Sequence, residues 1–168
     1  MSEVYVLIET SEGDMLAQLF PEAAPKSVHN FLHYVDKGHY TQTIFHRVVR
    51  GFVIQGGGYD RELNKKPADE PVINEAKGGF LNTKGTLSMA RAQAKDSARD
   101  EFFINAADNP DLDHEDDSDQ GFGYAVFGQV VDGMDVLKKI NWKVVKPRPG
   151  FPELPQDEVI IKSIVRFE

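Results

Sequence analysis

Apolar and polar residues alternate near the start of the chain. Every second residue is apolar in residues 4–8, and the alternation returns in residues 15–19 after the polar, glycine-containing stretch 11–14. Because successive side chains of a strand point to opposite faces, a period of two indicates a half-buried β-strand. The two runs therefore predict a β-hairpin at the N-terminus. Residues 159–165 are almost wholly apolar, and we expect this last strand to pair with the first.

A helical period replaces this alternation after Pro25. Four apolar residues occupy the i, i+3, i+4 and i+7 positions of one stripe, namely Val28, Phe31, Leu32 and Val35. Proline suits the first turn of a helix and glycine suits its end, so the pattern predicts a helix that begins at Pro25 and stops near Gly38. After Gly133, apolar residues three and four positions apart, among them Met134 and Leu137, predict a second and shorter helix.

Several short apolar runs lie between the two predicted helices. They are residues 44–49, 52–55, 86–90, 102–105 and 125–131. With the hairpin and the last strand, they amount to seven or eight short strands against two helices. This proportion favours a mainly β fold, either a barrel or a sandwich, over a parallel α/β sheet. The proline-rich stretch 146–152 is expected to be a surface loop.

Composition narrows the classes of function. The chain has 168 residues, enough for a substantial core, and we expect residues 1–168 to form a single domain. Its net charge of −8 argues against binding to nucleic acids or to anionic membranes. The absence of cysteine excludes disulfides, thiol nucleophiles and cysteine-ligated zinc. Because the N-terminus lacks a basic start and a long apolar run, it does not resemble a signal peptide, and we expect a cytoplasmic protein.

The segment Phe45-His46-Arg47 is the first candidate for chemistry. On a strand, Phe45 and Arg47 would face one side and His46 the other. A cation beside an aromatic ring, followed by apolar residues at positions 52 and 53, would form an apolar wall with one multidentate donor. An exposed arginine that lies over neighbouring rings fits the same spacing, so the pattern alone leaves both interpretations open.

The residues that follow raise a question of geometry. Strict alternation cannot place Phe52 and Gln55 on the same face of a strand. Gly51 is therefore expected to mark a bulge or a bend. The glycine run 56–58 lacks the spacing of a dinucleotide-binding loop. We expect these glycines to allow either a close approach of a substrate backbone or a bulge.

Several segments carry a resemblance to a known family. Residues 40–57 match its signature at Tyr40, Thr43, Phe45, His46, Arg47, Val48, Val49, Phe52, Val53, Gln55, Gly56 and Gly57. Residues 85–92, 102–104 and 126–130 match three further motifs in the same order. The chain thus resembles the cyclophilin-type peptidyl-prolyl cis–trans isomerases, in particular the bacterial cytoplasmic type. The resemblance spans nearly the whole chain and implies a closed eight-stranded antiparallel β-barrel capped by two α-helices.

The resemblance also implies roles for individual residues. Arg47 takes the place of the catalytic arginine, and Gln55 is expected to help orient it. The residues expected to bind substrate are Phe52, Val53, Gln55, Ala90, Arg91, Phe103, Leu112 and Tyr124. Those expected to support the site are Phe45, His46 and Glu101.

The implied reaction suits these residues. Rotation about an X–Pro bond has a barrier of ~20 kcal/mol because the amide nitrogen is conjugated with the carbonyl group. Twisting breaks this conjugation and leaves a lone pair on the nitrogen, and a guanidinium that donates to this lone pair stabilises the twisted state over both planar states. No covalent intermediate forms, so no cofactor and no metal are expected. The implied substrates are proline-containing polypeptides, whose folding this isomerisation assists, as a chaperone does.

Four positions depart from the usual pattern of the family. Arg91 stands where eukaryotic members commonly have asparagine, and Tyr124 where they often have histidine. Glu101 replaces the usual glutamine, and we expect it to pair with Arg47, to shape substrate preference, or to face solvent. Asp111 stands where many members have an aromatic ring that contributes to cyclosporin binding. We therefore expect cyclosporin to bind weakly.

Other functions remain open on the sequence alone. One is a proline-peptide binding module whose catalysis is incidental, and another is a hydrolase that uses His46 with an acidic residue. His29 and His33 have helical spacing, and residues 111–119 form an acidic run. The histidines lack a nearby third ligand, and the run lacks the glycine and glutamate of a calcium loop. We expect both to be solvated surface groups, and we expect a monomer.

Overall fold

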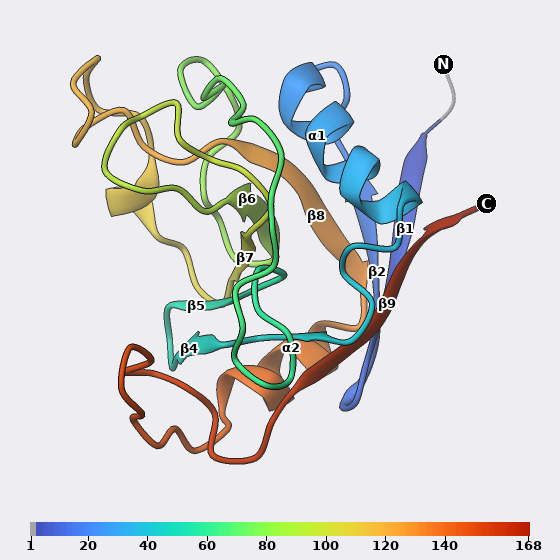
Figure 1. Ribbon diagram of the computed structural model, residues 1–168. Helices are drawn as coiled ribbons and strands as arrows, with labels where there is room; N and C mark the ends of the chain where they lie inside the picture. Colours follow the sequence, from blue (N-terminus) through green and yellow to red (C-terminus); the bar gives the residue numbers. More distant parts are fainter. Residues whose placement is uncertain (1–2) are drawn as a thin grey trace.

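The computed structural model describes residues 3–168 as one curled antiparallel sheet with two helices (Figure 1). The strands are β1 (Val4–Thr10), β2 (Gly13–Leu19), β3 (Thr43–Ile44), β4 (Arg47–Val49), β5 (Val53–Gly56), β6 (Thr86–Met89), β7 (Phe102–Asn105), β8 (Val126–Asp132) and β9 (Ile160–Phe167). The helices are α1 (Pro25–Asp36), α2 (Met134–Asn141) and a 3₁₀ turn, η1 (Pro110–Leu112). The predicted mainly β class is confirmed.

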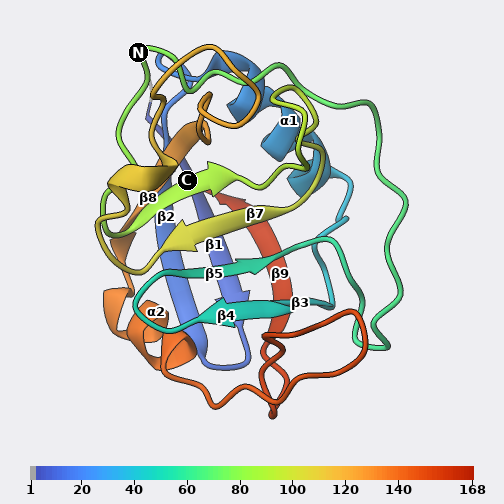
Figure 2. The same cartoon turned by 90° about the vertical axis from the view of Figure 1, so that its left-hand side faces the viewer.

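Strand pairing confirms the two expectations for the chain ends. β1 and β2 form an antiparallel hairpin that pairs Val4 with Leu19 and Thr10 with Gly13. β9 pairs with the other side of β1, with Tyr5 opposite Phe167. The full order is β3-β9-β1-β2-β8-β6-β7-β5-β4. Figure 2 shows β7, β5 and β4 side by side, and these strands carry much of the site described below.

The sheet has nine strands in the described residues instead of the expected eight, because the predicted strand 44–49 is divided in two. β3 pairs with β9 and β4 pairs with β5, while Phe45 and His46 between them belong to neither strand. The two end strands of the sheet are therefore consecutive parts of one segment. Within residues 3–168 no ladder of hydrogen bonds joins these two end strands, and the curled sheet has the form of a half-barrel.

This division also corrects the expected direction of Phe45. Its ring is fully buried in the main core, whereas Arg47 is only partly buried. Strict alternation predicted that the two side chains share a face. The rule fails here because the backbone leaves the extended ladder at residues 45 and 46. The guanidinium of Arg47 lies over the ring of Phe52 instead.

The helices lie at opposite ends of the curled sheet (Figure 1). α1 buries Val28, Phe31 and Val35 of its predicted apolar stripe. α2 begins directly after Gly133, which has a φ of +98°. A Cβ on this glycine would lie 2.5 Å from the backbone oxygen of Asp14. Glycine is required there both for the left-handed backbone and for this close approach.

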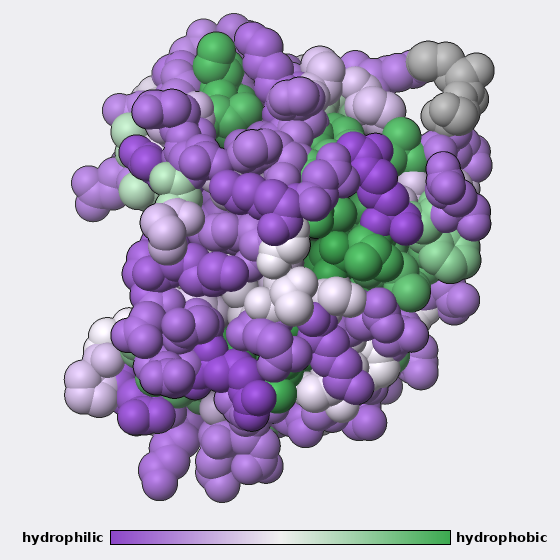
Figure 3. Space-filling view, turned by 45° about the vertical axis from the view of Figure 1, so that its right-hand side comes forward, coloured by the Kyte–Doolittle hydropathy of each residue, from purple (hydrophilic) through white to green (hydrophobic). Residues whose placement is uncertain are grey.

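Aromatic rings fill the part of the core that lies behind the candidate site. Phe102 packs edge-to-face against Phe31, Tyr40 and Phe45, with ring centroids 5.4, 5.4 and 6.0 Å away. The face of the molecule in Figure 3 is mostly hydrophilic, with its largest hydrophobic area right of the centre and smaller ones elsewhere. Within residues 3–168, neither helix is long or apolar enough to cross a bilayer.

Candidate functional site

One cavity of about 350 Å³ brings together residues from five separate parts of the chain. Its lining consists of Arg47, Phe52, Val53, Gln55, Ala90, Arg91, Phe103, Leu112 and Tyr124. These are the nine residues that the resemblance marks as catalytic or substrate-binding. The structure thus places all of them around one space, while their individual roles remain predictions.

Apolar side chains form the floor and walls of the cavity. Val53, Ala90 and Phe103 are buried in a small cluster of their own, separate from the main core. Partly buried residues pack around this cluster, including Leu112 and Tyr124. The ring of Tyr124 meets that of Phe103 edge-to-face at 5.6 Å. Such a surface suits a small apolar ring and excludes water from it.

The position of Phe52 resolves the problem of alternation. β5 begins at Val53, so Phe52 belongs to the preceding turn and does not follow the alternation of the strand. The turn contains Gly51, whose φ is +74°. The predicted bend at Gly51 is therefore present, and it allows Phe52 to join Val53 and Gln55 in the lining of one cavity.

Arg47 lies at the polar edge of the cavity. It sits on β4 directly opposite Gln55 of β5, and its NH1 group donates to Gln55 Oε1 at 3.2 Å. Its Nε donates to Glu153 Oε1 at 3.0 Å. The guanidinium carbon is 6.0 Å from the ring centroid of Phe52. The guanidinium is thus fixed by two acceptors beside an apolar surface.

Glu101 pairs with Gln55, His46 and Lys65, not with Arg47, and it is not turned to solvent, so these two expectations are wrong. Its effect on substrate preference remains a prediction. Its Oε1 accepts a hydrogen bond from Gln55 Nε2 at 3.1 Å and lies 3.2 Å from His46 Nε2. Because an ionised carboxylate only accepts hydrogen bonds, it fixes the Gln55 amide with its nitrogen toward Glu101. The amide oxygen of Gln55 then faces Arg47.

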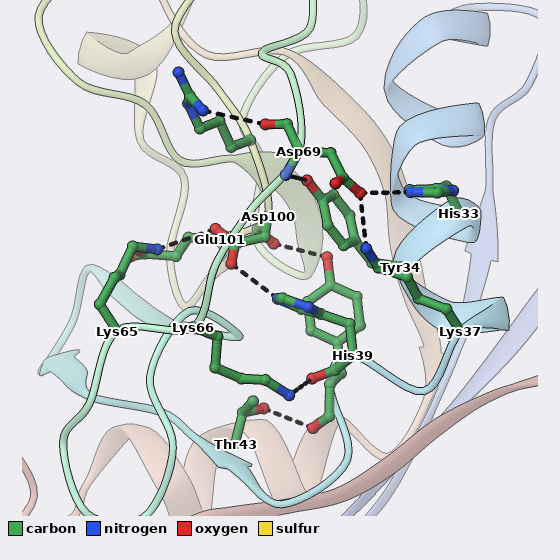
Figure 4. Close-up of polar contacts among 12 residues, drawn as sticks. His33, Tyr34, Lys37, His39, Thr43, Lys65, Lys66, Asp69, Asp100 and Glu101 are labelled. Atoms are coloured by element: carbon green, nitrogen blue, oxygen red, sulfur yellow. Dashed lines mark hydrogen bonds and ion pairs between the residues drawn. The ribbon is translucent and has the colours of Figure 1, made fainter.

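The charge of Glu101 is stabilised by its neighbours. Burial by itself raises the pKa of this carboxyl, but the hydrogen bond and charge of His46, the hydrogen bond of Gln55 and the charge of Lys65 outweigh it and lower the pKa to about 2. Lys65 Nζ lies 3.2 Å from Glu101 Oε2 and 3.2 Å from Asp100 Oδ1, as Figure 4 shows. Glu101 is therefore ionised throughout the physiological range.

A buried polar cluster supports Glu101 from behind. Asp100 is 2% exposed, and its Oδ2 lies 2.9 Å from His39 Nε2. The hydroxyl of Tyr40 donates to the backbone oxygen of Asp100 at 2.7 Å. These contacts fix the backbone on which Glu101 stands, since the two acidic residues are consecutive. Sequence patterns did not reveal Lys65 or Asp100 as part of this support.

The glycine run beside the site serves the protein's own packing. A Cβ on Gly56 would lie 2.5 Å from the backbone oxygen of Ile44, and one on Gly58 would lie 2.5 Å from Glu101 Cγ. Gly57 has a φ of +95° and approaches Tyr40. A close approach of a substrate backbone to these glycines remains a prediction. They let β3, Tyr40 and Glu101 approach β5 closely.

Arg91 forms part of the cavity wall, but backbone carbonyl groups occupy its guanidinium. Its Nε donates to Gly123 O at 2.9 Å, and its NH2 donates to Asp119 O at 2.8 Å. The guanidinium also lies over the Tyr124 ring, 4.7 Å from the centroid. Arg91 therefore ties the wall of the cavity to the acidic loop and stiffens it.

The remaining sequence candidates lie outside the cavity. His33 is exposed and its Nε2 lies 2.7 Å from Asp69 Oδ2, while His29 is also exposed. Asp111 is exposed on η1 next to the cavity residue Leu112. Within residues 3–168, no three His, Asp or Glu side chains are grouped closely enough to hold a metal ion.

We predict that Glu101→Gln makes the protein less sensitive to acid. The pKa of Glu101 lies near 2 in the folded protein, below its usual 4.5. Its contribution to stability is therefore complete above pH 4.5 and is lost as the pH falls through 2, and it amounts to at most about 3 kcal/mol. The variant should be less stable than the wild type at pH 7, and this difference should vanish near pH 2.

Urea unfolding at several pH values measures this effect. Glu62→Gln is a suitable control because Glu62 is exposed and forms no ion pair within residues 3–168. The control should follow the wild type at every pH. A constant difference between Glu101→Gln and the wild type from pH 7 to pH 2 would contradict the prediction.

The described geometry is an apolar cavity with a fixed cation at its edge, on a curled antiparallel sheet. The family described as "Cyclophilin type peptidyl-prolyl cis-trans isomerase/CLD" matches residues 5–166. The chain therefore belongs to the cyclophilin family, and it is a peptidyl-prolyl cis–trans isomerase.

Individual relatives agree with this assignment. Peptidyl-prolyl cis-trans isomerase B of Escherichia coli is 48% identical over 97% of this chain and 99% of its own length. Peptidyl-prolyl cis-trans isomerase A of Dickeya dadantii is 45% identical over 96% of this chain and 84% of its own length. A solved cyclophilin-type isomerase of Cryptosporidium parvum is 29% identical with a TM-score of 0.81, and the match covers 99% of both chains. These relatives leave the hydrolase interpretation without support.

Proposed function

We propose that Arg47 is the catalytic residue and that the apolar cavity beside it binds the substrate proline. The observation that carries this proposal is the fixed guanidinium at the edge of the cavity. Two of its five N–H groups are held by Glu153 and Gln55. Within residues 3–168 the other three make no hydrogen bond and are available to a bound peptide.

In the proposed reaction, the proline ring enters the space formed by Phe52, Val53, Phe103 and Leu112. The carbonyl group before the proline then rotates while the ring stays in place. As the C–N bond twists, the nitrogen becomes pyramidal and its lone pair accepts a hydrogen bond from Arg47. A charge-assisted bond of this kind contributes roughly 1.5–3 kcal/mol. The contribution is larger in a site whose donor is already oriented and where little water competes.

The proposed substrates are proline-containing polypeptides, bound with their backbone along Gln55, Ala90 and Arg91. A structure of the Cryptosporidium parvum protein in the presence of the dipeptide Ala-Pro supports this class, since that chain is 30% identical and has a TM-score of 0.80. We further propose that the chain works as a cytoplasmic monomer of one domain. Asp111, in place of an aromatic ring, supports weak binding of cyclosporin.

A titration with a short Ala-Pro peptide, followed by NMR, tests the location of the site. The amide resonances of Val53, Phe103 and Leu112, and the methyl resonances of Val53 and Leu112, should shift on addition of peptide. Two-dimensional exchange spectra of the same sample should show the peptide interconverting between its cis and trans forms far faster than it does alone. Shifts confined to another surface would refute the proposed site even if isomerisation were observed. Adding cyclosporin to the assay would test whether its inhibition is weak.

A further inference from the structure

We propose that Glu153 is a positioning residue for Arg47, and this inference rests on the proposed catalytic role of that arginine. The two residues are 106 positions apart in the chain, and Glu153 Oε1 accepts a hydrogen bond from Arg47 Nε at 3.0 Å. Glu153 comes from the long segment between α2 and β9. Apart from this contact with Arg47, Glu153 takes no part in the cavity wall.

The backbone around Glu153 is fixed against the strand that carries Arg47. The backbone oxygen of Glu153 accepts a hydrogen bond from the N–H of Val48, the residue after Arg47, at 2.9 Å. Leu154, the residue that follows Glu153, is buried. Two residues before Glu153, the ring of Phe151 packs edge-to-face on that of Tyr59, with ring centroids 5.0 Å apart. The carboxylate of Glu153 thus contacts Arg47 from a segment whose residues on both sides pack against the rest of the protein.

Two acceptors determine the orientation of the guanidinium in a way that one cannot. A single hydrogen bond from NH1 to Gln55 would leave the planar group free to pivot about that contact. The second bond, from Nε to Glu153, lies at a different corner of the plane and removes this freedom. The three remaining N–H groups, one on NH1 and two on NH2, then point in fixed directions.

The exposure of the pair argues that its main effect is on orientation. The side chain of Arg47 is 37% exposed and that of Glu153 is 34% exposed. Ion pairs with this much access to solvent add little to the stability of a fold. Orientation of a group that must meet a developing lone pair is more sensitive, because small displacements of a catalytic group cause large losses of rate.

The same segment offers a matched control. Glu158 forms an ion pair with Arg61, in which Arg61 Nε donates to Glu158 Oε1 at 3.1 Å. This pair also links the segment between α2 and β9 to the rest of the molecule, and its side chains are similarly exposed. It does not contribute to the cavity. Glu158→Ala therefore removes one tether of the segment without touching Arg47.

The test compares isomerase kinetics of the wild type, Glu153→Ala, Glu153→Gln and Glu158→Ala. We expect Glu153→Ala to lower kcat about tenfold, within the range known for misplaced catalytic groups, and to leave KM within about twofold, since the cavity is intact. Glutamine keeps an acceptor oxygen, so Glu153→Gln should recover most of the loss. Glu158→Ala should retain the wild-type kcat.

The NMR signal of the Arg47 Nε–H group provides a second readout that a general loosening of the segment would not move. It should exchange slowly with water in the wild type, in Glu153→Gln and in Glu158→Ala, and rapidly in Glu153→Ala. A wild-type kcat in Glu153→Ala, or an equal loss in Glu158→Ala, would overturn the inference. Arg47→Ala distinguishes the failure of this inference from the failure of the proposed catalytic role. If Arg47→Ala is inactive while Glu153→Ala is fully active, only the positioning role of Glu153 fails. If Arg47→Ala is itself fully active, the proposed catalytic role fails.

Discussion

Replacing Arg47 with alanine will lower kcat/KM for a short X–Pro peptide by at least about a hundredfold, the usual cost of removing an oriented donor from a transition state. Two cations line the cavity, Arg47 and Arg91. The guanidinium of Arg91 is occupied by backbone oxygens, which leaves Arg47 as the donor for the substrate. Because Arg47 is partly exposed, the free energy of unfolding should change little. An NMR exchange assay of cis and trans peptide measures the rate.

Two further variants sharpen this result. Arg47→Lys keeps the positive charge but cannot bond Glu153 and Gln55 while also donating to the substrate from a planar fork. It should therefore recover only a small part of the activity. Arg61→Ala removes a partly exposed arginine that lies outside the cavity, and it should be fully active. Turnover in Arg47→Ala equal to that of the wild type would exclude the proposed mechanism.

Phe102→Ala will act mainly on stability and Phe103→Ala mainly on catalysis, although the two residues are adjacent on β7. Phe102 is fully buried among Phe31, Tyr40 and Phe45. Its truncation leaves a cavity in a closely packed aromatic core and should cost about 3–5 kcal/mol of stability. This loss is a large fraction of the total stability of a typical domain, about 5–15 kcal/mol. Urea unfolding measures it directly.

Phe103 faces the substrate cavity, so its truncation should act on catalysis. The cluster around it is small and open to solvent on one side. Phe103→Ala should therefore destabilise the fold less than Phe102→Ala, and it should raise KM for proline peptides about tenfold through the loss of apolar contact with the ring. Phe102→Leu is the control for volume, and it should be close to wild type in KM. Equal loss of stability in both alanine variants, with no change in KM, would contradict this division.

The local pattern of the chain predicted most of the elements. The period of two at residues 4–8 and 15–19 predicted the hairpin, and the stripe along α1 predicted that helix between its proline and its glycine. α2 begins directly after Gly133, as expected. These features depend on residues within a few positions of one another, so they can be predicted from the local sequence.

The candidate site was less visible to local pattern. Spacing alone did not decide whether Arg47 is an exposed surface cation or part of a binding site. The resemblance to the cyclophilins marked the nine residues that the structure gathers around one cavity. Local alternation was wrong for Phe45, because the backbone leaves the ladder between β3 and β4. Local alternation also did not predict the position of Phe52, because this residue lines the cavity from a turn and not from a strand.

The sequence by itself determined which residue types are present and which segments form strands and helices, since these follow from periodicity and turn chemistry. It also contained the arginine and the apolar residues that the family resemblance identified. Only the tertiary structure decided what holds Arg47 in place. Glu153 lies 106 positions away, and Glu101 acts through Gln55, which is 46 positions from it. Contacts over such separations arise from the pairing of β4, β5 and β7 and from the return of the segment before β9, and no local pattern encodes them.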